Sequence, residues 1–72
     1  MTDGLDAATV DLLGVLAYGE LTAFERLASD ARLAPSVADK TALATMAAAE
    51  FGHFQKLREH LAASGVDIER TW

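Results

Sequence analysis

Two glutamates and a histidine occupy positions where the surrounding pattern calls for apolar side chains. Glu50 and His53 are three residues apart, which places both side chains on one face of a helix. Glu20 interrupts a second apolar stripe in the same way. Carboxylate oxygens and an imidazole nitrogen on one face can reach the same metal ion, and this donor set suits iron or manganese, with zinc also acceptable. These residues therefore predict a metal site formed by Glu20, Glu50 and His53.

The two stripes are otherwise almost wholly apolar. Their members, spaced alternately by three and four residues, are Val10, Leu13, Ala17, Glu20, Phe24, Leu27 and Ala31, and then Leu43, Met46, Glu50, His53, Leu57 and His60. Such spacing is typical of helices that face a partner helix. A carboxylate buried there must be protonated, paired or bound to a metal ion. Because no lysine or arginine lies on either stripe near this level, an internal salt bridge is disfavoured.

The elements that must position these residues are two long helices joined by a short turn. We expect a helix over 7–33, a turn over 34–36, a second helix over 37–63 and a tail over 64–72. Ser36 is suited to cap the start of the second helix, and Gly65 is suited to a left-handed cap at its end. Each helix is then about 40 Å long. The short connection predicts an all-α, antiparallel helical hairpin.

The turn also predicts which residues lie at the same height. If the centre of the hairpin is near Pro35, residue numbers that face each other add up to about 70. Glu20 then comes level with Glu50. His53 lies opposite Ala17, whose small side chain leaves room for an imidazole. The polar side chains are therefore expected in one layer, with apolar layers above and below.

Composition excludes several classes of protein. The chain has 72 residues, 51% of them hydrophobic, no cysteine and a net charge of −5. It is too apolar for a disordered chain and has no thiolate for a disulfide or a thiolate metal site. The acidic balance makes nucleic-acid binding unlikely. We find no secretory signal, and charges interrupt every apolar stretch before it is long enough to cross a bilayer. The expectation is a soluble cytoplasmic protein without a membrane partner.

The apolar surface indicates association with other chains. Leu12, Val15 and Leu16 widen the hydrophobic arc of the first helix beyond what one partner helix covers. Ordering 72 residues also opposes folding by roughly 100 kcal/mol of conformational entropy, which a single helix–helix seam does not offset. We therefore expect a homo-oligomer, either a dimer of hairpins or a larger assembly.

Two segments resemble a known family. The stretch from Tyr18 to Ala28 resembles the first helix of an actinobacterial ferritin-like family, and Ala47 to Phe54 resembles its second. That family is related to the di-iron hydroxylase that modifies a thiolated isopentenyl-adenosine in tRNA. The resemblance spans about residues 10–68. It implies that Glu20, Glu50 and His53 correspond to the first half of a di-iron site, whose other ligands come from a second helical pair in family members.

The ligand count agrees with such a site. Ferritin-like di-iron bundles use one Glu from each of two helices and a Glu-x-x-His pair from each of the other two. This chain has half of that set, so either a second copy or a further part of a longer chain would complete a ferritin-like four-helix bundle. Four carboxylates would then balance two divalent ions. We expect dioxygen to react there in oxidase, hydroxylase or iron-oxidising chemistry, whereas the acidic charge disfavours a tRNA substrate.

Other interpretations remain open. A non-catalytic helical dimerisation module would use the same polar layer, protonated and hydrogen-bonded, to fix its register. Iron oxidation with storage would require a closed shell or a compartment partner. His60 is expected to be partly exposed near the open end of the hairpin. Tyr18 is two residues from Glu20 and is expected to point to a different face.

Overall fold

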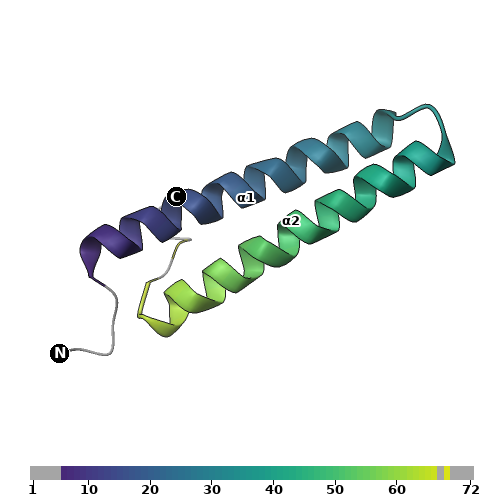
Figure 1. Cartoon of the computed structure of the whole chain (residues 1–72). Coiled ribbons are helices and arrows are strands. Elements are labelled where there is room, and N and C mark those ends of the chain that lie inside the picture. The colour runs from purple at the N-terminus through teal and green to yellow at the C-terminus, as the bar shows by residue number, and fades with distance from the viewer. Residues whose placement is uncertain (1–5, 67, 69–72) are drawn as a thin grey trace.

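The chain folds into an antiparallel pair of long helices (Figure 1). In this computed structural model, which describes residues 6–66 and 68, helix α1 spans Ala7–Leu33 and helix α2 spans Val37–Ala63. No strand occurs among those residues. The predicted all-α hairpin is confirmed. Most of the predicted tail after Val66, including Trp72, lies outside the described residues.

Side-chain caps define where each helix begins. The Thr9 backbone N–H donates to an Asp6 carboxylate oxygen at 2.7 Å, and the Asp39 N–H donates to Ser36 Oγ at 3.0 Å. Each bond satisfies a donor that the first helical turn leaves without a partner. The bonds from Thr9 hold the pKa of Asp6 below its ordinary value. At the other end of α2, Gly65 has a φ of 86°, the left-handed conformation that glycine adopts without strain.

The turn is held by a lysine that bridges the two helices. Lys40 Nζ, from the first turns of α2, donates to the carbonyl oxygens of Ala31 at 3.3 Å and Arg32 at 2.8 Å. The last carbonyls of a helix have no partner within it, and they carry partial negative charge. A cation at this position therefore stabilises the end of α1 and ties it to the start of α2.

The core of the hairpin is small. Its main cluster of buried residues is Ala17, Phe54, Leu61 and Ile68, and Ala47 is buried apart from that cluster; Leu61 is the largest side chain that is fully enclosed. The Phe51 ring packs against two other rings in tilted arrangements, with centroid distances of 5.1 Å to Phe24 and 5.9 Å to Phe54. No polar or charged side chain among the described residues is buried. Packing within the hairpin is thus limited to the single interface between α1 and α2.

The register differs from the expected one by about one helical turn. Glu20 contacts His53, and Phe24 stacks on Phe51, so the paired numbers add up to 73 and 75 rather than 70. The reason is the direction of the side chains, because each Cα–Cβ bond tilts toward the N-terminus of its helix. In an antiparallel pair this tilt carries α1 side chains away from the turn and α2 side chains toward it.

Helix α1 corrects one expectation from the sequence. By length and composition alone it is apolar enough to cross a membrane, although only 6% of its most apolar stretch is buried within the hairpin. Although Asp11 and Glu20 interrupt this helix, its mean hydropathy remains high enough for a membrane-spanning helix. A single such helix is weak evidence for a membrane span. What it does establish is a large apolar surface on α1 that the hairpin itself leaves uncovered.

Candidate metal centre

Three potential ligands meet halfway along the hairpin. Glu20 comes from the middle of α1, and Glu50 and His53 come from the middle of α2. One ligand atom from each lies within 4.8 Å of the other two. His53 Nδ1 and Glu20 Oε2 are 3.0 Å apart, the distance of a hydrogen bond in which the Nδ1–H tautomer donates to the carboxylate. The three predicted side chains are therefore brought together.

The local sequence explains this convergence. The spacing of three residues between Glu50 and His53 aligns them on one face of α2. Across the seam, Ala17 is fully buried, and a methyl group at this position allows α2 to approach closely. Glu20 follows three residues after Ala17, so it lies on the adjacent part of the same helix face. The register described above then brings Glu20 against both α2 side chains.

Glu20 influences the protonation of Glu50. The pKa of Glu50 is raised above 4.5, chiefly by its hydrogen bond with Glu20, then by burial and by the negative charge of Glu20, while His53 acts in the opposite direction. A hydrogen bond between two carboxyl groups requires a proton between them. The pair is consequently adapted to hold either a shared proton or a cation.

The three groups do not lie inside the isolated hairpin. The side chain of Glu20 is 29% exposed and that of His53 is 59% exposed, whereas the stripe pattern placed them in the interior. The reason is that two helices have one mutual seam, and residues beside that seam remain open to solvent. Their neighbours at helical spacing are apolar, namely Leu16, Leu27, Met46 and Leu57. We call the surface formed by these four residues together with Glu20, Glu50 and His53 the open face.

The donor set fits a metal ion. Two carboxylates and one neutral imidazole provide two negative charges, which balance one divalent cation. Donor atoms on opposite sides of a metal with bonds of about 2.1 Å are about 4 Å apart, so small side-chain movements bring atoms within 4.8 Å into range. Oxygen and nitrogen donors without sulfur suit iron, manganese or zinc. No other group of three His, Cys, Asp or Glu side chains lies this close within residues 6–66 and 68.

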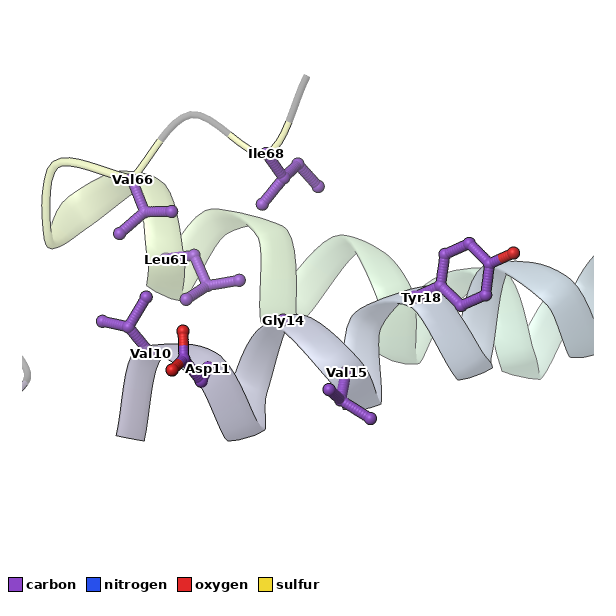
Figure 2. Close-up of a pocket in the computed structure, with 8 residues that line it drawn as sticks. All are labelled: Val10, Asp11, Gly14, Val15, Tyr18, Leu61, Val66 and Ile68. Atoms are coloured by element: carbon purple, nitrogen blue, oxygen red, sulfur yellow. The ribbon is translucent and has the colours of Figure 1, made fainter. Parts of the chain in front are cut away.

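A groove on the other side of the hairpin was not predicted. It has a volume of 370 Å³ and is lined by Val10, Asp11, Gly14, Val15, Tyr18, Leu61, Val66 and Ile68 (Figure 2). Tyr18 and Glu20 are two residues apart and so point to nearly opposite sides of α1. The spacing of seven residues between Asp11 and Tyr18 was a signal for a common face. Figure 2 shows that Val66 and Ile68, from the segment after α2, cover part of this side.

The remaining polar residues stay apart from the three ligands. His60 is exposed, and so are Glu25 and Glu59. None of them belongs to the group formed by Glu20, Glu50 and His53. Glu25 and Glu59 thus contribute negative charge to the surface, and the exposure of His60 agrees with its predicted position near the open end of the hairpin.

Comparison with known proteins agrees with the geometry. The family described as "Ferritin-like domain, actinomycetes" matches residues 3–72. No curated protein and no solved structure matches the chain. The family match covers nearly the whole chain, including both helices and all three clustered side chains. The chain therefore belongs to the ferritin-like domain family of actinomycetes.

Proposed function

We propose that the chain is a metal-binding component of a ferritin-like carboxylate protein that uses dioxygen as an oxidoreductase. The observation that supports this most is the convergence of Glu20, Glu50 and His53 at one level of the hairpin. Members of a ferritin-like family with this donor set are expected to hold iron, although manganese or zinc would also be accepted. When bound, an iron pair supplies the capacity to reduce dioxygen.

Each side chain has a distinct part in this proposal. Glu50 and Glu20 would hold the metal through carboxylate oxygens, and His53 would hold it through an imidazole nitrogen. Carboxylates bind metals in their ionised form and histidine binds in its neutral form. Any proton held between Glu50 and Glu20 must therefore leave when a cation enters. His53 can keep its Nδ1 hydrogen bond with Glu20 and offer Nε2 to the ion, because a ligating histidine commonly donates its other ring N–H to a carboxylate.

One hairpin supplies only half of a dinuclear site. The ferritin arrangement combines one Glu from each of two helices with a Glu-x-x-His pair from each of two more. In this chain α1 supplies the single Glu20, and α2 supplies Glu50 with His53. A second helical pair with the same donors would complete the set, and its helices would cover the open face. Enclosure of the site would also exclude water and strengthen the electrostatic interactions within it.

Anaerobic titration with Fe²⁺ tests this proposal. Native protein is expected to bind about one iron per chain, and its absorbance should change when oxygen is admitted. Glu50→Gln should lose this binding. Glu59→Gln is the matched control, because it makes the same change in α2, nine residues on and on the opposite side of the helix. Absence of iron uptake by native protein, or equal loss in both variants, would refute the proposal. Uptake far above one iron per chain would instead indicate storage.

A second candidate function rests on the hydrogen bond between Glu20 and Glu50. Because one shared proton satisfies this pair without metal, the layer is also suited to a non-catalytic module that dimerises through the open face. Such a polar layer would fix the register of association rather than support chemistry. It predicts that Glu50→Gln leaves association intact and that added iron changes neither stability nor absorbance.

A further inference from the structure

The hairpin exposes more surface than a compact protein of its size. Monomeric proteins of 7.6 kDa expose about 4,300 Å² by the usual scaling of surface with mass. This chain exposes 5216 Å². The excess of about 900 Å² is a total for all 72 residues, including those outside the described ranges, and it is of the same order as the roughly 800 Å² that each partner contributes to a standard protein–protein interface. One partner of similar size would therefore restore an ordinary surface area.

The excess surface is not distributed evenly around the hairpin. On the groove side, the chain covers itself, because Ile68 packs against Leu61 and Ala17 in the core. On the open face, no described segment covers the ligands. Leu16 is 47% exposed and Met46 is 54% exposed there, one on each helix. The open face is consequently the surface that a partner would cover.

The pattern along the open face fits a second copy of itself. The ligand layer lies near the middle of the hairpin, with Leu27 and Met46 on the turn side and Leu16 and Leu57 on the other. Consider a two-fold axis that passes through the ligand layer, lies in the plane of the open face and is perpendicular to the helices. Rotation by 180° about this axis exchanges the two apolar regions. Each apolar end of one hairpin then meets the opposite apolar end of the other, while the polar layers meet at the centre.

We propose that two copies of this chain pack through their open faces as an antiparallel, two-fold symmetric four-helix bundle. The two turns lie at opposite ends, and the axis passes between the two sets of Glu20, Glu50 and His53. This inference deepens the proposed function, because it identifies the second helical pair as another copy of the chain. It depends on the proposed function for the ions between the layers, and not for the contact itself.

A lipid surface is a poorer occupant of the same face. Contact with a bilayer through the open face would carry Glu20 and Glu50 into the hydrocarbon, where a charged side chain is strongly unfavourable. A second copy brings polar groups against polar groups. The chain's net charge of −5 also opposes binding to anionic lipids.

Sedimentation of native protein and two variants tests the contact. Leu16→Glu introduces a charge in the open face, whereas Val15→Glu, at a residue 69% exposed, introduces the same charge about 140° around the helix from Glu20. We expect native protein and Val15→Glu to be dimers, and Leu16→Glu to be a monomer that keeps its helical circular dichroism. Monomeric native protein, with Mn²⁺ or with chelator, overturns the inference. The inference is also overturned if native protein is a dimer that Val15→Glu dissociates and Leu16→Glu does not. Native protein that floats with lipid vesicles and does not dimerise overturns it as well.

The orientation is tested by spin labels on the cysteine-free chain. Val37→Cys places a label beside the turn, and the antiparallel bundle predicts about 40 Å between the two labels along the helix axes. A short distance between labels indicates turns at the same end and overturns the orientation. These experiments can refute the metal site without refuting the dimer interface, and the reverse. A dimer that binds no Mn²⁺ refutes the metal site and retains this interface, whereas a monomer that binds Mn²⁺ does the reverse.

Discussion

Glu50→Gln is predicted to destabilise the metal-loaded protein without destabilising the metal-free protein. In the folded, metal-free chain the pKa of Glu50 is raised, chiefly by its hydrogen bond with Glu20. A raised pKa means that the folded state favours the protonated form, so its contribution to stability is present at low pH and is lost as pH rises through the raised pKa, above 4.5. Glutamine is nearly isosteric and remains neutral. Metal-free Glu50→Gln is therefore expected to melt at a temperature equal to or above that of native protein at neutral pH.

Metal reverses the comparison. A ligand present at 100 times its Kd stabilises the folded state by about 2.7 kcal/mol per site. For a domain of this size that corresponds to a rise in Tm of roughly 10–20 °C. Loss of an outer-shell partner already weakens metal binding by about 10–100-fold, and loss of a direct ligand should weaken it at least as much. With a 100-fold weaker Kd the same metal concentration stabilises by only about 0.4 kcal/mol, so most of the shift disappears.

The measurement is thermal unfolding followed by circular dichroism, with chelator and with Mn²⁺ or anaerobic Fe²⁺. Glu59→Gln serves as the control and should show the native metal shift. Two results would contradict the reasoning. A metal-free Glu50→Gln that melts well below native protein would show that Glu50 stabilises the hairpin without a cation. A metal shift of native size in Glu50→Gln would show that Glu50 is not a ligand.

Four further predictions concern the scaffold. Asp6→Asn keeps a capping oxygen but cannot titrate. Because the folded pKa of Asp6 lies below 3.8, native protein should be more stable than this variant to urea at neutral pH and should lose that advantage as pH falls through the lowered pKa. An advantage in stability that does not depend on pH would contradict this. Leu61→Ala should destabilise by about 2–5 kcal/mol, seen as a lower urea midpoint, because Leu61 is fully buried. Gly52→Ala should stabilise metal-free protein by about 1 kcal/mol in the same assay, since nothing outside the adjacent residues and the nearby backbone of α2 lies within 4 Å of the added methyl. Lys40→Met should increase hydrogen exchange at the turn, because the carbonyls of the last turn of α1 lose their donor.

The sequence predicted the hairpin because local signals agree with each other. Ser36 and Gly65 are residue types that cap helices, and both act as caps in the structure. The layer of Glu20, Glu50 and His53 was also predictable, because helical spacing and a short turn leave little freedom in the register. The side-chain contacts Glu20–His53 and Phe24–Phe51 lie about one turn away from the pairs obtained by counting. Counting residues from the turn locates Cα atoms, whereas contacts depend on the direction of the side chains.

Exposure of the ligands was beyond what the stripe pattern could specify. Periodicity shows which residues share a face, but it does not distinguish the seam between two helices from a face awaiting further helices. Leu61 and His60 illustrate this, because they are neighbours in sequence and His60 continues the predicted stripe, yet Leu61 is the residue that is buried. The packing of Ile68 was similarly hidden, because contacts of a short tail segment leave no periodic signal.

Anomalous X-ray diffraction at the iron edge, from crystals grown with Fe²⁺ under anaerobic conditions, tests the metal centre most directly. We predict two iron peaks about 3.5–4 Å apart, each bound by Glu50 and His53 of one copy and with Glu20 in the same ligand layer. Iron peaks bound elsewhere, or crystals that take up no iron while the three side chains remain in contact, would contradict this prediction.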